Sequence, residues 1–500
     1  MIKRLKSMFM GAVVAIVAAP LFAGTVLAGD ITIDLAGEPA TLDPHKHWNP
    51  TSYYVYRNIF DNILTRDNDG NIVGQIATDW KQTSDSTLEL TIRKGVTFHD
   101  GEALEASDVA FSVKRITDKE FGSQQLGQFN KIIDASANGD VVTLTTDGPY
   151  PALMAQLVKL SVVPEHVVTA VGDDAFNAAP VGSGAYAFSN WDRGVSVTLT
   201  RYDGYWGNKG PFESAIFRAV PDAATRVADL QAGTADLVVS IDSDAASQLA
   251  SNSAVKVLSA PTERVGFMGL NLDKPPFNNF EMRKAASLAI DRVAITEGLL
   301  QAGEVPMAQM SSPAHFGYNP NVPAFEYDLE AAKAITAANA ELAATPATLA
   351  TAPVFDQRIV QALQQMLNDA GFNVSIAMND MPTFLSIVRS DPSENSELSF
   401  GRWSCACQDA DGIAYPTLHS TSSWSRVNVP EIDSLLDEAR ASLDTSVRQA
   451  AYNKVHEIVR ENYYTLPLYQ AAVLYGSTAD LAFEPTANES MFLNRMSMSK

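Results

Sequence analysis

Histidine and aspartate stand next to each other at His99-Asp100-Gly101, and such a pair could in principle carry out general acid–base chemistry. Neighbouring side chains of an extended segment point to opposite faces, however, so His99 and Asp100 cannot readily act on the same proton. An Asp-Gly pair is typical of a tight turn. We therefore interpret this motif as a turn and not as a catalytic pair.

Two further motifs also fall short of a catalytic or metal site. His45 and His47 are two residues apart and could share a face, but two histidines alone do not complete the ligand set of a zinc site. Gly182-Ser183-Gly184 lacks the Gly-x-Ser-x-Gly spacing of a nucleophile elbow, and neither a P-loop nor a dinucleotide-binding fingerprint occurs. The sequence therefore predicts no metal site, no cofactor and no enzyme activity.

The first 28 residues have the features of a cleavable secretory signal. Three cations precede an apolar run of about 15 residues, and small residues follow at the −3 and −1 positions of a cleavage site; these are Lys3, Arg4 and Lys6, residues 8–22, and Val26-Leu27-Ala28. A retained membrane anchor is the weaker alternative, because spanning a bilayer takes about 20 residues. No cysteine follows the run for lipid attachment. We expect cleavage after Ala28, with Ala23 as second choice, and a free periplasmic protein.

Charge and length limit the partners of the mature chain. The 500 residues carry 36 Lys+Arg against 58 Asp+Glu, and removing residues 1–28 deletes three cations, which takes the formal net charge from −22 to −25. Such a charge repels phosphate backbones and anionic lipid head groups. The length is enough for two or three domains. We expect a soluble exported monomer that binds neither nucleic acid nor membranes.

The only two cysteines, Cys405 and Cys407, exclude a disulfide framework. Exported proteins usually oxidise their thiols, but residues two apart on an extended strand have Cα atoms about 7 Å apart, at the limit that a disulfide tolerates. A disulfide therefore requires a local turn. Two buried, reduced thiols remain the alternative.

Hydrophobic periodicity predicts a mixed α/β chain. Residues 31–35 alternate as a strand, 51–64 carry a helical apolar face, and 80–98 are typical of an antiparallel pair with a turn at Lys94-Gly95. Residues 348–378 predict a β-α-β unit with Gly371 at the end of its helix, and hence a parallel sheet in the second half of the chain.

Motifs along nearly the whole mature chain resemble the peptide/nickel-type, or family 5, extracellular solute-binding proteins of ABC importers. The residues that carry the resemblance, in chain order, are Trp80, 87–101 (TLELTIRKGVTFHDG), 107–112 (SDVAFS), 180–186 (PVGSGAY), Tyr205-Trp206, 269–272 (GLNL), 283–291 (RKAASLAID) and 464–468 (YTLPL). The resemblance implies an α/β, two-lobed periplasmic binding protein fold of type II, cluster C, with an extra subdomain near 65–180.

The resemblance also implies where the chain divides. The first lobe would comprise residues 29–262 and a C-terminal return over 470–500, and the second lobe residues 263–469. The chain would cross between the lobes near 260–265 and again near 466–470. These two crossings would form the hinge on which the lobes close.

The family's ligand-recognition segment places the candidate site in the second lobe. In peptide-binding members a Trp-x-x-Asp motif holds the ligand's α-amino group, but here Trp403 is followed three residues later by Ala406. Asp409, which matches the family's next acidic position, and Asp411 remain. The missing carboxylate weakens the expectation of an ordinary peptide as ligand.

Neighbouring side chains suggest what binds instead. Arginine can grip a carboxylate with two hydrogen bonds, and tryptophan offers a flat surface; the candidates are Arg402, Trp403, Trp424 and Arg426. We expect a facing wall from Trp48, Tyr53 and Tyr54, and an anion anchor at the helix start, Thr51-Ser52. For Trp403 the alternative is a core position, for Arg426 a solvated surface, and for Thr51-Ser52 a simple helix cap.

Together these features predict the periplasmic substrate-binding component of an ABC importer. It would hold a peptide-like, opine-like or other carboxylate-bearing solute between two hinged lobes and deliver it to the permease subunits. Two alternatives stay open: an exported hydrolase of peptides or glycoconjugates, and a metal-chelate carrier similar to nickel-binding members.

Overall fold

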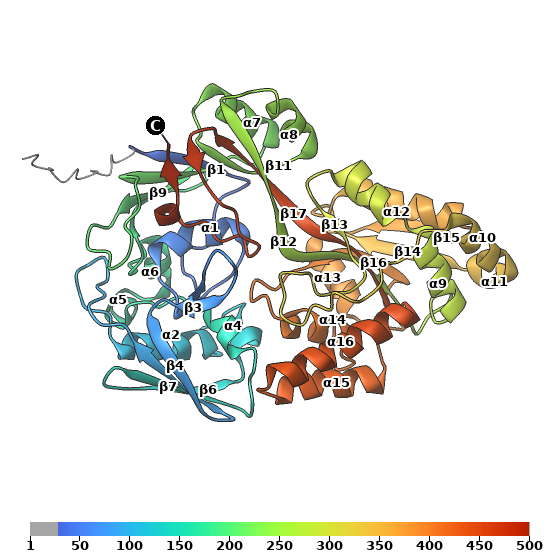
Figure 1. The fold of residues 1–500 in the computed structure, drawn as a ribbon, viewed down its shortest axis with the longest axis horizontal. Coiled ribbons are helices and arrows are strands. Elements are labelled where there is room, and N and C mark those ends of the chain that lie inside the picture. Colours follow the sequence, from blue (N-terminus) through green and yellow to red (C-terminus); the bar gives the residue numbers. More distant parts are fainter. Residues whose placement is uncertain (1–28, 500) are drawn as a thin grey trace, which may run out of the picture.

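The computed structural model describes residues 29–499, which form two lobes joined by two long strands (Figure 1). The expected signal segment, residues 1–28, lies outside the described residues. We call residues 29–262 and 470–499 lobe I, and residues 263–469 lobe II. Strands β12 (Val255–Leu270) and β17 (Thr465–Thr478) pair with each other in antiparallel fashion and run through both lobes.

One sheet continues across the two lobes. Its strand order is β15-β14-β16-β12-β17-β11-β1-β10-β9-β8, and β13 (Val305–Pro306) also pairs with β17. In lobe I, β17 pairs with β11 through residues 474–477, whereas in lobe II β12 pairs with β16 through residues 265–270. The β12/β17 pairing breaks register between Pro261 and Val265, where the two strands pass from one lobe to the other.

Lobe I is built on a mixed sheet whose strands are β1 (Ile31–Leu35), β8 (Tyr186–Asp192), β9 (Ser196–Arg201), β10 (Ser214–Ala219) and β11 (Leu237–Ile241). Strand β1 runs parallel to both β10 and β11, and its Ile31, Ile33 and Leu35 are fully buried, as the alternation of residues 31–35 predicts. Its helices outside the subdomain are α1 (Pro50–Ile59), α5 (Glu165–Val171), α6 (Asp173–Ala178), α7 (Ala223–Ala232) and α8 (Ser243–Leu249).

Helix α1 is shorter than the predicted 51–64. It ends because Phe60 has an extended backbone, with φ −120° and ψ 138°. The turn at Gly182 approaches this end so closely that a Cβ there would come within 2.8 Å of the Phe60 ring. The chain then continues into β2 (Leu64–Arg66), which pairs with β3 (Ile72–Gly74).

A separate four-stranded sheet forms a subdomain within lobe I. Its order is β4-β5-β7-β6, with β4 (Ala77–Ser84), β5 (Thr87–Ile92), β6 (Ile132–Asn138) and β7 (Val141–Thr146). Residues 80–98 contain an antiparallel pair, as expected, but Leu88, Leu90 and Ile92, which point into the subdomain core, belong to its second strand. The hairpin turn is therefore at Asp85-Ser86 and not at Lys94-Gly95. Helices α2 (Ala106–Thr117), α3 (Leu126–Phe129) and α4 (Leu153–Leu157) complete the subdomain.

Lobe II contains the predicted parallel β-α-β unit. Strand β14 (Pro346–Thr351) leads through α12 (Gln357–Asp369) to β15 (Asn373–Met378), and Gly371 has the expected positive φ, 98°. Strand β16 (Leu398–Trp403) joins the other edge of β14. The remaining helices are α9 (Phe280–Ala289), α10 (Leu329–Ala338), α11 (Ala340–Ala343), α13 (Met381–Arg389), α14 (Ala414–Leu418), α15 (Pro430–Ala441) and α16 (Thr445–Asn462).

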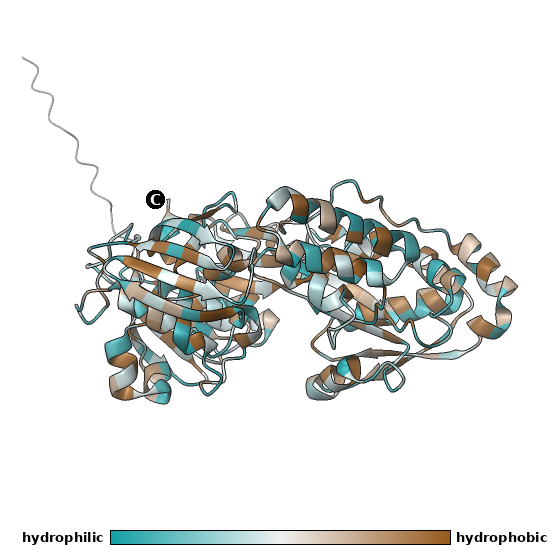
Figure 2. Cartoon of the chain, turned by 90° about the horizontal axis from the view of Figure 1, so that it is seen from below, coloured by the Kyte–Doolittle hydropathy of each residue, from teal (hydrophilic) through white to brown (hydrophobic). Residues whose placement is uncertain are grey.

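Short elements complete the chain: a π-helix, Ala294–Leu300; 3₁₀ turns at Ala410–Gly412 and Leu493–Arg495; and the pair β18 (Leu481–Ala482) with β19 (Ser497–Met498). Hydrophobic and hydrophilic residues alternate along the helices of both lobes (Figure 2), as expected of helices that bury one face. Among residues 29–499, no helix combines the length and the apolar character that crossing a membrane requires.

Candidate functional site

A cavity of about 900 Å³ lies between the two lobes. Lobe I contributes Trp48 and parts of segments 124–131 and 147–159, and lobe II contributes 403–406, 411–416, 421–424 and Arg440. We call this cavity the cleft. Its volume lies in the range of known small-molecule sites. Its two walls belong to different lobes, which the β12 and β17 strands connect.

The lobe I wall carries two amines. Lys159 is buried, and its ammonium group donates a hydrogen bond to Oε1 of Gln128. Burial lowers the pKa of Lys159 to about 8, against the opposing attraction of Glu263. Lys131 is half-buried beside the ring of Tyr150, and burial also lowers its pKa. Neither amine forms an ion pair within the described chain, so both can receive an anionic group.

Trp48 adds a hydrogen-bond donor to the same wall. Its indole packs at a tilt against Tyr53, with ring centroids 5.7 Å apart. The indole N–H is buried and has no hydrogen-bond partner among residues 29–499. A buried N–H without a partner is costly, so an acceptor that reached this group would be stabilised by it.

The lobe II wall is aromatic, and its charges are already paired. Trp403 and Trp424 meet edge to face with centroids 4.9 Å apart, and the Trp403 N–H donates to the carbonyl of Gly412 at 2.9 Å. Arg440 donates to both carboxylate oxygens of Asp411 and lies over the Tyr415 ring at 3.3 Å. This wall therefore offers ring faces and one neutralised ion pair.

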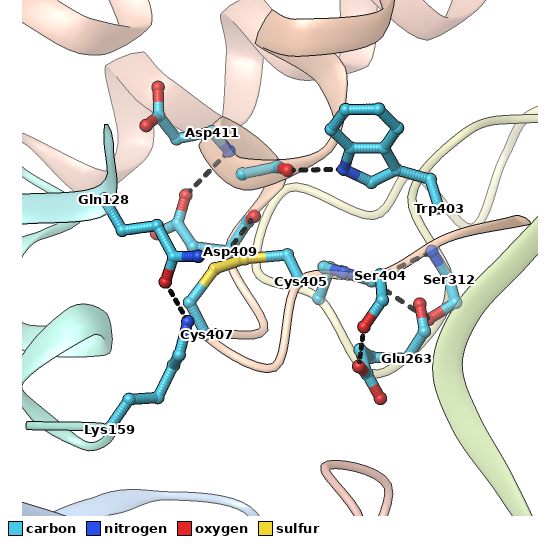
Figure 3. The surroundings of a disulfide bond; sticks show 12 residues. Gln128, Lys159, Glu263, Ser312, Trp403, Ser404, Cys405, Cys407, Asp409 and Asp411 are labelled. Atoms are coloured by element: carbon cyan, nitrogen blue, oxygen red, sulfur yellow. Dashed lines mark hydrogen bonds between the residues drawn. A yellow bond between two sulfur atoms is a disulfide. The ribbon is translucent and has the colours of Figure 1, made fainter. Parts of the chain in front are cut away.

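Cys405 and Cys407 form a disulfide in the cleft wall (Figure 3). The chain turns there, with a hydrogen bond from the Gln408 N–H to the Cys405 carbonyl at 2.8 Å, and the Cα atoms of the cysteines lie 5.1 Å apart. This turn removes the spacing problem of an extended strand. Gly412 passes so close that a Cβ there would lie 2.9 Å from the Cys407 sulfur, and hence only glycine fits.

The disulfide loop, residues 405–408, also contacts lobe I. Arg66 donates to the carbonyl of Cys407 at 2.6 Å, and Ala155 packs against both cysteines. The loop therefore bridges the lobes at the edge of the cleft.

Buried polar groups tie the lobe crossing to the recognition segment. Ser404 donates to the carboxylate of Glu263, which is fully buried and whose pKa is raised by that burial (Figure 3). The next residue, Arg264, pairs with Glu489 at 2.6 Å. Movement at this crossing would therefore be transmitted directly to the cleft wall.

Two predicted ligand residues, Arg402 and Arg426, lie outside the cleft. Both arginines line a neighbouring pocket of about 120 Å³ in lobe II, which shares Trp403 and Trp424 with the cleft. The Arg426 guanidinium is occupied by the backbone carbonyls of Val388, Ser390 and Ser425. The expectation that these arginines grip the ligand stays a prediction.

Three predicted residues of lobe I are likewise not in the cleft wall. Tyr53 and Tyr54 are 0% and 3% exposed, because α1 is packed on all sides in the core of lobe I. Asn49, and not Thr51, caps helix α1 by accepting from the Ser52 N–H at 2.9 Å. Thr51 does not line the cleft, so the alternative of a simple cap describes this helix start better than an anion anchor.

Asp409 has an internal role. Its carboxylate is 2.7 Å from the Arg448 guanidinium and also accepts from the Asp411 N–H at 2.9 Å. Burial raises the pKa of Asp409, and Arg448 opposes that rise. Of the predicted site residues, Trp48, Trp403, Asp411 and Trp424 therefore line the cleft, whereas Asp409 supports the loop behind it.

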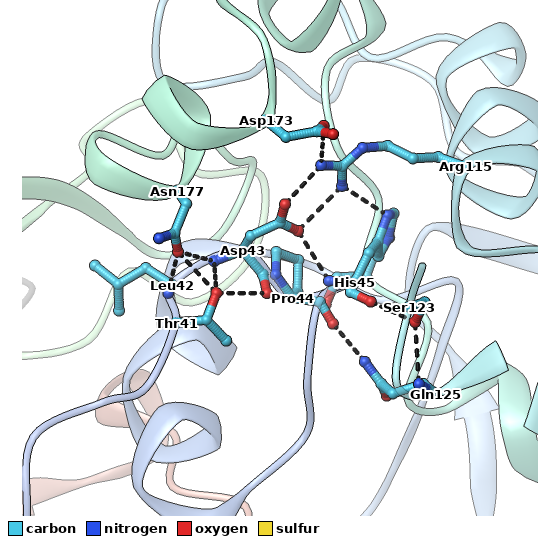
Figure 4. Close-up of polar contacts among 11 residues, drawn as sticks. Thr41, Leu42, Asp43, Pro44, His45, Arg115, Ser123, Gln125, Asp173 and Asn177 are labelled. Carbon is cyan, nitrogen blue, oxygen red and sulfur yellow. Dashed lines mark hydrogen bonds and ion pairs between the residues drawn. The ribbon is translucent and has the colours of Figure 1, made fainter. Parts of the chain in front are cut away.

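The histidine motifs hold loops in place. Asp100 contacts His166 at 2.7 Å, while both ring nitrogens of His99 bind the backbone of residues 182–184, in keeping with the interpretation of this motif as a turn. His45 belongs to a buried network in which Arg115 bridges Asp43 and Asp173 (Figure 4). Among residues 29–499, no three His, Cys, Asp or Glu side chains gather as a metal site requires.

Sequence reasoning missed Lys131, Lys159 and Tyr415. One signal was present for Lys159, since it is the only charged residue in the largely apolar stretch 152–163. Lysine is rarely fully buried, so a lysine in such a stretch is unusual.

Comparisons with known proteins identify the fold. A family model described as bacterial extracellular solute-binding proteins, family 5 Middle, matches residues 71–425. The glutathione-binding protein GsiB of Pectobacterium atrosepticum is 25% identical over 463 residues, covering 89% of each chain.

Two solved structures share the fold. CtaP, an ABC transporter substrate-binding protein of Listeria monocytogenes, superposes with a TM-score of 0.85 at 20% identity and covers 95% of this chain and 100% of its own. The periplasmic binding protein DppA of Helicobacter pylori, in complex with the peptide STSA, gives 0.79 at 22% identity and covers 95% and 99%. The predicted two-lobed periplasmic binding protein fold is confirmed, and the chain belongs to family 5 of the bacterial extracellular solute-binding proteins.

Proposed function

We propose that this chain is the free periplasmic substrate-binding component of an ABC importer, and that its cargo is a peptide-like or other carboxylate-bearing solute. The observation that carries this proposal is the cleft itself, in which the unpaired amine of Lys159 faces an aromatic wall from the other lobe. Relatives named for glutathione and for peptides support the cargo class.

The anionic end of the solute is assigned to lobe I. The ammonium groups of Lys159 and Lys131 would bind the carboxylate by charge-assisted hydrogen bonds, and the Trp48 N–H would donate to a nearby oxygen. Across the cleft, Trp403 and Tyr415 would cover flat parts of the solute. Contacts to both lobes would stabilise their closed arrangement over an open one, and without such contacts closure has no driving force.

The α-amino group plays a smaller part in this proposal than in peptide-binding relatives. Ala406 lines the cleft at the place where the resemblance expects an aspartate, and the remaining carboxylate of that wall, Asp411, is neutralised by Arg440. We expect discrimination to depend on the solute's anionic group.

Further parts of the proposal concern assembly and processing. The chain would act as a monomer, be released after cleavage at Ala28 without a lipid anchor, present its closed form to permease subunits, and release its cargo unchanged. A hydrolase would instead convert the solute, which is measurable in the same binding mixtures.

Isothermal titration calorimetry with ligand-stripped mature protein tests this function. The panel comprises di- and tripeptides including glutathione, opine-type conjugates, and each peptide in N-acetylated and C-amidated form. We expect one saturable site for at least one carboxylate-bearing solute, little change on acetylation, and strong weakening on amidation. No heat with any anionic or zwitterionic candidate, or conversion of the solute, would sink the proposal.

A further inference from the structure

A second polar cavity, of about 280 Å³, lies on the other side of the disulfide loop from the cleft. Three arginines line it: Arg57 from α1, Arg66 from β2 and Arg495 from the C-terminal segment. Gln408, from the disulfide loop of lobe II, forms part of the same wall. The cavity shares no lining residue with the cleft. We call it the arginine cavity.

The three guanidinium groups lack counter-charges. Within residues 29–499 none of them forms an ion pair, although the chain as a whole is strongly acidic. Arg57 and Arg495 lie over the same Phe492 ring, 4.9 Å and 4.1 Å from its centroid. Burial and, to a smaller extent, repulsion from Arg57 lower the pKa of Arg495. Holding these like charges together therefore costs electrostatic free energy.

Some donor groups of this cluster are also unused, although the terminal nitrogens of Arg66 donate to the Gly70 and Cys407 carbonyls and those of Arg495 to the Arg66 carbonyl. The Nε–H groups of Arg57 and Arg66 are buried without hydrogen-bond partners in the described chain, and Arg57 is only 3% exposed. The terminal nitrogens of Arg57 reach only the Phe60 carbonyl at 3.4 Å and the Thr65 hydroxyl at 3.5 Å, which are long contacts. Of the other buried arginines, Arg115 and Arg448 have carboxylate partners, whereas Arg226, Arg283 and Arg292 donate to backbone carbonyls.

The acids near the cavity do not neutralise it. Asp67 and Asp69 line its rim, but the Asp67 oxygens accept from the backbone and side-chain N–H groups of Asn71, at 2.8 Å and 3.1 Å. Asp69 is exposed to solvent. Asp409, whose charge is also felt by Arg66, is paired with Arg448. Three cations against two engaged or exposed carboxylates leave the cavity positive.

We propose that the arginine cavity is a binding site for a small oxyanion, a carboxylate or phosphate group, held between Arg57, Arg66 and Arg495. Guanidinium groups are planar, keep their charge and present paired N–H donors that match the oxygens of such anions. The anion would relieve the repulsion among the arginines and fill unused donor positions. This site is additional to the cleft and does not depend on the proposed cargo.

The location of the cavity couples it to the lobes. Arg66 also donates to the Cys407 carbonyl, and Gln408 belongs to the same loop, so an anion here would contact residues of both lobes. An oxyanion would therefore favour the arrangement in which the loop is docked on lobe I, and by linkage a cleft ligand that favours this arrangement would strengthen anion binding.

The test measures binding of inorganic phosphate and of acetate to the mature protein by calorimetry at constant ionic strength. Arg495→Gln is the principal variant, because this side chain is partly exposed and its loss should leave the fold intact. Arg193→Gln is the matched control, since Arg193 is an exposed arginine of lobe I that stacks on Trp191 at 3.3 Å. The two probes separate a phosphate preference from a carboxylate preference.

We expect one saturable site for at least one probe, weakened about tenfold or more in Arg495→Gln and unchanged in Arg193→Gln. Binding should persist in Lys159→Met, whose change lies in the cleft. The proposal is overturned if the parent protein binds neither probe, if both arginine variants bind equally well, or if Lys159→Met alone abolishes binding. Thermal unfolding of each variant with and without phosphate checks folding in the same series.

Discussion

The two walls of the cleft use charge in opposite ways. On the lobe II wall and directly behind it, Asp411 is paired with Arg440 and Asp409 with Arg448, and Arg426 is held by backbone carbonyls. On the lobe I wall, Lys159 has a single amide partner and Lys131 has a long contact to a carbonyl at 3.4 Å. The charged residues of the lobe II wall are therefore paired. The two lysines of the lobe I wall are not.

This difference separates structural charges from binding charges. A paired buried ion holds a loop in one geometry, and removing its partner leaves an uncompensated charge. An unpaired buried ammonium carries a standing desolvation cost that an anionic ligand relieves. We therefore expect changes in lobe II charges to affect mainly folding, and changes in lobe I charges to affect mainly binding.

The largest effect is expected for Asp409→Ala. This change leaves Arg448, which is 3% exposed, buried without its carboxylate, and should lower the free energy of unfolding by about 3–5 kcal/mol. Urea unfolding measures it. Asp411→Ala is the control and should cost less, because the side chain of Arg440 is 30% exposed and can reach water. Equal costs for the two variants would contradict the distinction.

Lys159→Met should act on binding and not on folding. Loss of a charge-assisted hydrogen bond of about 1.5–3 kcal/mol corresponds to roughly 10- to 100-fold weaker binding of the solute. The free energy of unfolding should stay equal or rise, because a buried ammonium is replaced by an apolar side chain. Lys131→Met serves as the comparison and should weaken binding less, since Lys131 is only half-buried. Unchanged affinity in Lys159→Met would contradict the claim that the lobe I wall binds the anionic group of the solute.

The affinity for an anionic solute should depend on pH through Lys159. Its pKa in the free protein is lowered to about 8, so the amine is charged below pH 8 and becomes neutral above it. A bound carboxylate favours the charged amine, and the affinity should therefore fall as pH rises beyond 8, by up to about tenfold per unit.

Calorimetry between pH 6.5 and 9.5 follows this dependence. The Lys159→Met variant provides the control, because its weaker binding should show no fall above pH 8 from this group. A parent protein whose affinity is flat across pH 8 would show that the amine does not contact the anion.

The smallest effect is expected for Arg402→Gln. Arg402 is exposed and does not line the cleft, so affinity and free energy of unfolding should both stay within about 0.5 kcal/mol of the parent protein. Parallel calorimetry and urea unfolding measure both quantities. A tenfold loss of affinity would instead identify Arg402 as a ligand residue.

The sequence predicted the elements better than the site. The strand 31–35, the β-α-β unit over 348–378 and the two-lobed fold follow from periodicity and from motifs spread along the chain. The faces of individual side chains were harder to predict. Arg402 and Trp403 are adjacent, but only Trp403 lines the cleft, and Tyr53 is buried because α1 has protein on all sides.

Pairing across the fold was beyond local reasoning. Asp409 and Arg448 are 39 residues apart, and nothing in either neighbourhood shows that they meet. Lys159 could be recognised as unusual in an apolar stretch, but its position opposite Trp403 follows only from how the two lobes meet. The sequence could not decide between a disulfide and two reduced thiols, because the disulfide depends on a turn at Gln408, which has a φ of 56°.

The most direct test of the central claim is the identity of the solute that the protein carries. The protein is purified under native conditions and then denatured, and the released material is quantified by mass spectrometry, in parallel for the parent chain and Lys159→Met. The account predicts a carboxylate-bearing solute at close to one molecule per parent chain and strong depletion in the variant. Equal amounts in both proteins, or a solute without an anionic group, would contradict it.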